Sequence, residues 1–137
     1  METIPDDKHD LFEKPAIATF ASLLPNGRPH VTPVWVDYDG THVLVVTRTG
    51  TRKYKNVQHD PRVTVTIIDP DDMYRYVEVR GDVEKMPTDG ALAFSDKQAQ
   101  RYWGVDEYPY ARDAERVLMH IRPERVVSPE VGTPTRD

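Results

Sequence analysis

Residues 42–53, HVLVVTRTGTRK, contain a transition from a strand to a helix, and the rest of the fold can be worked out from it. The first half of this stretch is almost entirely apolar, which predicts a strand buried on both faces. The Thr-Gly-Thr at residues 49–51 breaks that strand, and Thr51 is the expected N-cap of a short helix over residues 52–58. A buried strand therefore leads through a glycine-containing loop into a helix.

The chain upstream of this stretch has the pattern of a β-hairpin. Asn-Gly at residues 26–27 separates two strand-compatible runs, residues 16–23 and 28–37, and is a strong signal for a tight turn. The second run contains Pro29 and Pro33. Because proline cannot donate to a ladder, this strand should lie at a sheet edge or contain a bulge.

The elements downstream are also mostly strands. Val and Thr alternate with period two over residues 63–67, as in a half-buried strand. A longer alternating run covers residues 74–83, and Gly81 within it indicates a bulge. We expect a longer helix over residues 88–103, capped by Thr88, and a last strand over residues 115–121 that extends to about residue 127.

This order predicts a mainly β (β+α) protein, an antiparallel barrel of about six strands with one short and one longer inserted helix. We expect one domain over residues 1–137, with an N-terminal helix within residues 1–14 and a frayed tail over residues 128–137. Two helices cannot cover all the strands, so we expect a homodimer.

The composition limits the possible functions. The 137-residue chain has a formal net charge of −5, which argues against nucleic acid and anionic membranes as partners. Residues 1–14 show no secretion signal, and no apolar run approaches the ~20 residues that span a bilayer, so we expect a cytoplasmic protein. The absence of cysteine excludes disulfides and thiolate nucleophiles, and the scattered histidines favour no metal site.

One basic region interrupts this acidic chain. Between Arg48 and Arg62 five basic residues face a single acidic one, a local charge of +4. The N–H groups at a helix start are unsatisfied, and the helix dipole makes this end positive. Arg52 and Lys53 in the first turn add two cations. This arrangement suits the phosphate of a small ligand, although a solvated basic helix has the same pattern.

Four stretches, in the same order along the chain, resemble one protein family. They are PNGRPHVTPVWVDYDG (25–40), RTGTRKYKNVQHDPRV (48–63), DPDDMYRYVEVRGDVE (69–84), and RYWGVDEYPY with IRPERV (101–110, 121–126). The chain is similar to the pyridoxamine 5′-phosphate oxidase-like, FMN-binding split barrels and, more narrowly, to their subgroup of probable coenzyme F420-dependent oxidoreductases. It is shorter than true pyridoxamine phosphate oxidases and lacks their C-terminal substrate-phosphate motif, which argues against pyridoxal phosphate synthesis.

The resemblance implies a six-stranded split barrel, a homodimer, and a cofactor in the groove between protomers. It places the cofactor phosphate at Arg52 and Lys53. The remaining implied cofactor-binding residues are Pro33, Val34, Trp35, Thr47, Arg48, Thr51, Tyr74 and Tyr76. Lys55 and Arg75 would suit the oligoglutamate tail of F420.

The function expected from this resemblance is hydride transfer between coenzyme F420, or alternatively FMN, and a small organic substrate. The cofactor ring performs that chemistry, so no dedicated acid–base pair is required. Arg48 is the candidate to stabilise negative charge on the reduced ring. Tyr102, Trp103, Tyr108 and Tyr110 either form core or dimer packing or line a substrate pocket. The alternatives are a noncatalytic flavin, F420 or haem binding or storage protein, and an adaptor without cofactor.

Overall fold

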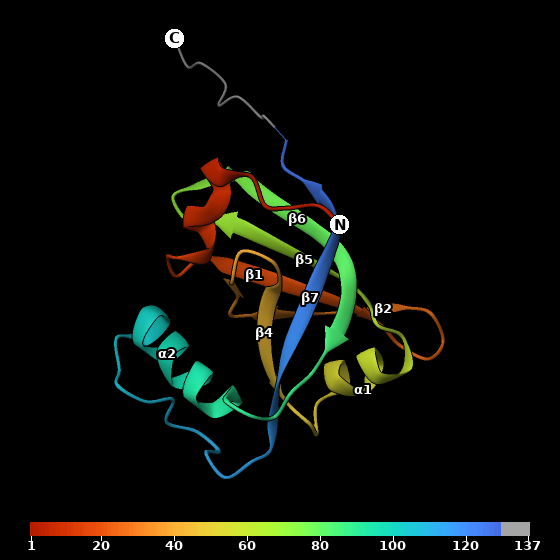
Figure 1. The fold of residues 1–137 in the computed structure, drawn as a ribbon, viewed down its shortest axis with the longest axis vertical. Coiled ribbons are helices and arrows are strands. Elements are labelled where there is room, and N and C mark those ends of the chain that lie inside the picture. The colour runs from red at the N-terminus through yellow and green to blue at the C-terminus, as the bar shows by residue number, and fades with distance from the viewer. Residues whose placement is uncertain (130–137) are drawn as a thin grey trace.

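The computed structural model describes residues 1–129, which form a seven-stranded antiparallel sheet with one 3-10 helix and two α-helices (Figure 1). The elements in chain order are η1 (Asp6–Phe12), β1 (Ile17–Leu23), β2 (Pro29–Val34), β3 (Asp37–Tyr38), β4 (Val43–Arg48), α1 (Arg52–His59), β5 (Arg62–Asp69), β6 (Asp72–Lys85), α2 (Ala91–Trp103) and β7 (Arg116–Val127). The expected tail lies, from residue 130 onward, outside the described residues.

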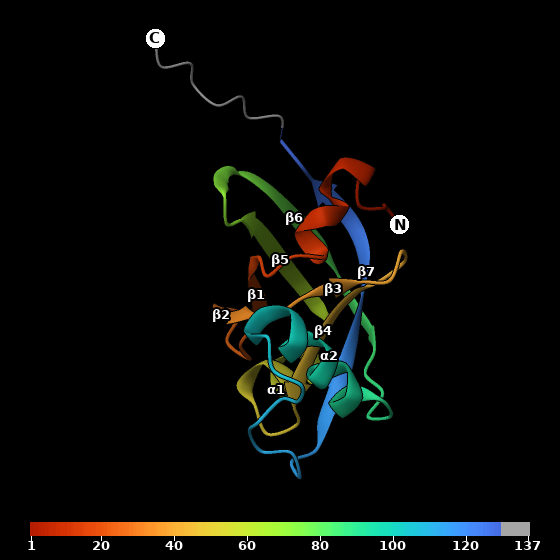
Figure 2. The same cartoon turned by 90° about the vertical axis from the view of Figure 1, so that its left-hand side faces the viewer.

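The sheet is curled and split. Its strand order is β2-β1-β5-β6-β7-β4-β3, so its two edges, β2 and β3, are consecutive in the chain but share no ladder within residues 1–129. Figures 1 and 2 show α1 and α2 near one end of the curled sheet and η1 near the other. The predicted mainly β split-barrel fold is confirmed. No helix in the described part of the chain is both long and apolar enough to cross a bilayer.

The core fills the inside of this curl. Alternate residues of β5 are buried, as the period-two pattern of its sequence predicts. β4 is buried along almost its whole length, which agrees with its continuous apolar sequence. Leu11 and Phe12 of η1 close one end of the core, and Phe20 of β1 lies at its centre with no exposed surface.

Three local expectations are confirmed. The Thr51 hydroxyl caps α1 by accepting a hydrogen bond from the Tyr54 N–H at 3.3 Å. The proline-containing β2 is an edge strand. The β6–β7 register shifts between Arg80 and Gly81, as expected for a bulge.

The strand count differs from the expected six because residues 28–37 do not form one strand. The buried Val36 leaves the ladder, and its backbone is bonded to α2 instead. Its N–H donates to the Tyr102 hydroxyl at 3.4 Å, and its carbonyl accepts from Arg101 at 3.5 Å. The tertiary contact with α2 therefore divides the run into β2 and the short β3.

Three elements also differ in detail from the expectation. The N-terminal helix is a 3-10 helix that follows Pro5 without a side-chain cap. α2 begins at Ala91 after Gly90, which has a left-handed backbone (φ 77°), rather than after Thr88. The last strand is one continuous element, because Pro123, which has no N–H, lies opposite the Gly81 bulge.

Candidate functional site

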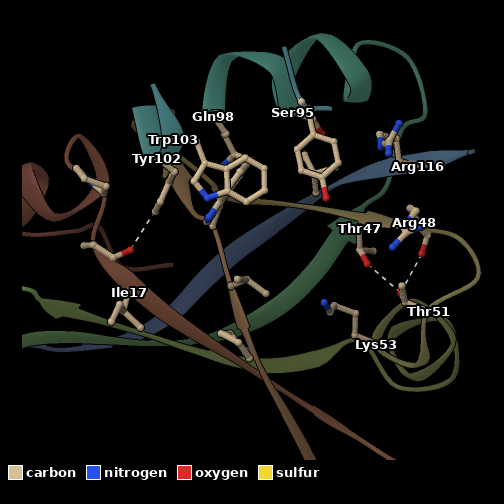
Figure 3. A pocket seen from close by; sticks show the side chains of 17 residues that line it. Ile17, Thr47, Arg48, Thr51, Lys53, Ser95, Gln98, Tyr102, Trp103 and Arg116 are labelled. Carbon is tan, nitrogen blue, oxygen red and sulfur yellow. Dashed lines mark hydrogen bonds between the residues drawn. The ribbon is translucent and has the colours of Figure 1, made fainter. Parts of the chain in front are cut away.

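A pocket of about 480 Å³ lies between α2, the starts of β1 and α1, and the ends of β2 and β4 (Figure 3). Its volume is in the range of small-molecule and cofactor sites. Figure 3 shows Lys53, Thr51 and Arg48 at one end and Tyr102 and Trp103 at the other. The lining residues are Pro15, Ala16, Ile17, Pro33, Val34, Trp35, Val46, Thr47, Arg48, Thr51, Lys53, Ser95, Gln98, Tyr102, Trp103, Tyr108 and Arg116.

The polar end is built by the turn from β4 into α1. The Thr51 hydroxyl donates to the Arg48 carbonyl at 2.9 Å, so the Thr47 hydroxyl, 2.8 Å away, is the donor in the pair of threonines. The Thr51 hydroxyl also accepts from the Tyr54 N–H. Its one donor and two acceptor positions are therefore all used within the turn itself. Thr51 therefore fixes the loop geometry, and the donors left for a ligand are the first amides of α1 and the Lys53 amine.

The charge of the pocket is entirely positive. Arg48, Lys53 and Arg116 line it, and no aspartate or glutamate does. None of these three cations forms an ion pair within residues 1–129. Burial lowers the pKa of the Lys53 amine, and the nearby Arg48 charge lowers it further. A bound anion would relieve both effects.

Arg116 was not predicted from the sequence. It is 5% exposed, and its strand position pairs directly with Arg48 across the β4–β7 ladder. Like charges at opposed positions of a sheet repel each other. The sequence signal was a basic residue directly before the apolar residues Val117, Leu118 and Met119, and nothing local shows that β7 pairs with β4.

α2 adds two neutral polar groups to the wall of the pocket. Ser95 is 5% exposed and Gln98 is 2% exposed. The Gln98 amide nitrogen is buried without a hydrogen-bond partner in the described structure. A buried amide that lines a pocket and lacks a partner is suited to donate to a ligand carbonyl or ring nitrogen.

The opposite end of the pocket is aromatic. Trp35 stacks on Tyr102 with ring centroids 4.9 Å apart, and Trp103 stacks on Tyr108 at 5.7 Å. Trp35 also meets Trp103 edge to face at 4.5 Å. Tyr110 packs against Trp103 at the rim, where both are at least half exposed. The aromatic residues late in the chain thus form a wall with Trp35.

The pocket brings together seven of the ten predicted cofactor-binding residues. They are Pro33, Val34, Trp35, Thr47, Arg48, Thr51 and Lys53. Arg52 is exposed at the first turn of α1 and does not line the pocket. Tyr74 and Tyr76 lie near the start of β6, where Tyr76 pairs with Ile68, and also lie outside the lining.

Arg75 does not have the free side chain that its proposed role in tail binding requires. Its guanidinium donates to Asp69 at 2.8 Å and to Asp10 at 2.6 Å. Asp69 also accepts from Lys14 at 2.8 Å, so the acidic loop belongs to an ion-pair network. No group of three or more potential metal ligands occurs in the part of the chain that the structure describes.

Residues 4–128 match the family model described as pyridoxamine 5′-phosphate oxidase. The chain belongs to the pyridoxamine 5′-phosphate oxidase family. No curated protein matches it significantly by sequence. The family match covers every residue that lines the pocket.

Known structures agree with this family assignment. A protein named F420 reductase is 36% identical, with a TM-score of 0.81 over 90% of this chain and 98% of that chain. The conserved hypothetical protein Rv2991 from Mycobacterium tuberculosis is 24% identical, with a TM-score of 0.69 over 96% and 93%. HupZ from Group A Streptococcus is 19% identical, with a TM-score of 0.67 over 97% and 99%. The last two share the fold alone.

The residues of the pocket fit a flavin-type ligand of this family. A flavin or deazaflavin combines a flat conjugated ring, which needs apolar walls and a few donors, with a phosphate, which needs cations and amides. The aromatic wall and the Gln98 amide meet the first need. Lys53 and the start of α1 meet the second.

Proposed function

We propose that this protein binds coenzyme F420, or alternatively FMN, in the pocket and transfers hydride between the cofactor and a small organic substrate. The supporting observation is the cationic, carboxylate-free pocket at the junction of β4 and α1. The 36% identity to a protein named F420 reductase favours F420 over FMN.

Each part of the proposed site has a separate task. Lys53 and the first amides of α1 would hold the phosphate, with the exposed Arg52 adding positive charge nearby. Pro33, Val34 and Trp35 would flank the ring together with Thr47. Arg48, at the end of β4, would place positive charge beside the ring and stabilise its reduced form.

The cofactor supplies the hydride chemistry when it is bound. The protein's residues have to orient the reactants, exclude water and provide charge. No histidine or carboxylate lines the described pocket, and hydride transfer by the cofactor needs no dedicated acid–base pair. The apolar and aromatic lining instead favours exclusion of water.

We also propose that the functional unit is a homodimer. The face of the sheet opposite the core carries Ile17, 62% exposed, and Val31, 57% exposed. Ile17 also lines the pocket, so a partner on this face would reach the pocket mouth. In the dimer, Tyr74 and Tyr76 would be available to contact the ligand bound by the other protomer.

Titration of the cofactor-free protein with FMN and with F420 tests the proposal. We expect Lys53→Gln to weaken binding of either cofactor by about 1.5–3 kcal/mol, roughly 10- to 100-fold, because it removes a charge-assisted contact. Lys97→Gln is the matched control, since Lys97 is exposed on α2 and does not line the pocket. Equal binding by both variants would contradict the phosphate anchor.

A noncatalytic flavin, F420 or haem carrier is the second candidate function. The lack of a histidine or carboxylate in the lining suits it as well as it suits hydride transfer. Turnover of the cofactor-loaded protein against a panel of electron acceptors separates the two. Tight binding without turnover would favour the carrier.

A further inference from the structure

Arg116 is a buried cation that the proposed phosphate anchor does not require. Its guanidinium donates to the Ala111 carbonyl at 3.0 Å and to the Arg112 carbonyl at 3.5 Å, and it lies 5.7 Å from the centre of the Tyr108 ring. These contacts orient the side chain but leave its positive charge unpaired. An unpaired buried charge is unfavourable, and an anionic ligand would remove the penalty.

The pocket has more positive charge than a cofactor phosphate needs. A phosphate group carries at most about two negative charges, which Lys53 and the nearby Arg52 already match, and Arg48 is assigned to the ring. Arg116 comes from a different wall. Figure 3 shows it on the α2 side of the pocket and Lys53 on the α1 side, with Thr47 and Arg48 between them.

The surroundings of Arg116 indicate what kind of molecule would bring the second anion. Tyr108 beneath the guanidinium is part of the aromatic wall, where it stacks on Trp103. Ser95 and the unpaired Gln98 amide line the same pocket from α2. A flat conjugated molecule could therefore stack on the aromatic wall while an acidic substituent reaches the guanidinium.

We propose that Arg116 selects substrates that combine a planar conjugated body with a carboxylate, and that it binds the carboxylate. This inference rests on the proposed function, in which the cofactor phosphate occupies the Lys53 end of the pocket. Arg116 would then be a specificity-determining residue and would contribute little to cofactor affinity.

Asp96 is the positioning residue for this contact. From α2 it accepts two hydrogen bonds from Arg112, at 2.6 and 3.1 Å, and one from the Tyr108 N–H at 2.9 Å. These bonds hold the loop whose Ala111 and Arg112 carbonyls orient Arg116. Ala111 has a left-handed backbone (φ 46°), an unfavourable conformation for a residue with a Cβ, so the loop depends on such restraints.

A pair of probes that differ only in charge tests the proposal. Calorimetric titrations of cofactor-saturated protein would compare 2-naphthoate with 2-naphthamide. We expect the wild type to bind the carboxylate at least about tenfold more tightly, as a charge-assisted contact implies. Arg116→Gln should abolish this preference, Arg116→Lys should keep part of it, and Arg62→Gln, at an exposed arginine outside the pocket, should keep all of it.

Cofactor affinity is the second measurement and separates the possible failures. We expect Arg116→Gln to change the Kd for FMN and F420 by less than about threefold. Weakening of both cofactors as severe as that of Lys53→Gln would place Arg116 in the phosphate anchor and overturn the proposal. Weakening of F420 alone would assign Arg116 to the cofactor tail and also overturn it. Failure of the wild type to bind either cofactor would contradict the proposed function, and the naphthoate preference of the cofactor-free protein would still test Arg116.

Asp96→Asn keeps the proposal testable if Arg116→Gln does not fold. The substitution weakens the link from α2 to Arg112 and leaves Arg116 itself in place. We expect the naphthoate preference to fall while the cofactor Kd stays within about threefold of the wild-type value. An unchanged preference in both Asp96→Asn and Arg116→Lys would overturn the proposal.

Discussion

The absence of a side chain at Gly81 allows β6 and β7 to approach each other closely. A Cβ at this position would lie 2.1 Å from the Arg122 carbonyl oxygen, a backbone atom that can move only with its strand. We predict that Gly81→Ala lowers the free energy of unfolding by about 1–3 kcal/mol, because β6 and β7 must separate to admit the methyl group. Urea denaturation of the variant and the wild type measures this difference.

Gly50→Ala is the matched control for that substitution. An added Cβ at Gly50 meets no atom within 4 Å, and Gly50 is not among the glycines with positive φ. We expect its unfolding free energy to stay the same or to rise by less than about 1 kcal/mol, because alanine restricts the unfolded chain. Equal losses in the two variants would show that the close approach at the bulge is not the cause.

At the scale of elements, an ion-pair network joins η1 to the β5–β6 hairpin. Asp69, 6% exposed, accepts from Lys14 and Arg75, and Arg75 also reaches Asp10. The hydrogen bond from Lys14 is the main cause that holds the pKa of Asp69 well below its ordinary value of 3.8. The charged form is thus favoured by folding, and its contribution to stability is present above pH 3.8 and lost as the pH falls below it.

We predict that Asp69→Asn lowers the unfolding free energy by about 1.5–3 kcal/mol at neutral pH, because two cations lose a charged acceptor. The difference from the wild type should shrink as the pH falls below 3.8. Thermal unfolding between pH 7 and pH 2.5 measures this dependence. Asp71→Asn is the control, because its side chain is 86% exposed and lies 3.5 Å from Lys14. A difference in stability between Asp69→Asn and the wild type that stays constant with pH would contradict the stabilising role of the Asp69 charge.

At the scale of the whole molecule, the face of the sheet opposite the core is the proposed dimer interface. In the β2–β1–β5 ladders Val31 lies opposite Ala21, which in turn lies opposite Thr64, so these side chains share this face. We predict that Val31→Asp converts a dimer into a monomer of 15.7 kDa, because it buries an unpaired charge in the interface. Light scattering coupled to size exclusion measures the mass.

Val105→Asp provides the control for the dimer prediction. Val105 is also apolar and exposed, at 40%, but it follows α2 and lies outside the sheet. We expect this variant to keep the wild-type mass. A wild type that is monomeric at micromolar concentration would refute the dimer.

Much of the fold followed from features that act between near neighbours in the chain. The cap at Thr51, the prolines of β2 and the alternation in β5 each act through one hydrogen bond, one missing donor or one repeat of the backbone. Such effects operate over a few residues, so the sequence was sufficient to predict them. The polar end of the pocket, at Thr47, Arg48 and Lys53, follows from the same local transition.

The pairing of distant strands settled the rest. Arg116 lies opposite Arg48 only because β7 inserts between β4 and β6, a choice made by many weak contacts of the entire core. Partners from other elements likewise tied Arg75 into an ion-pair network and drew Val36 out of its strand. Long-range packing has no signature in a short window of sequence. The position of Arg116 in the pocket therefore became visible only in the folded chain.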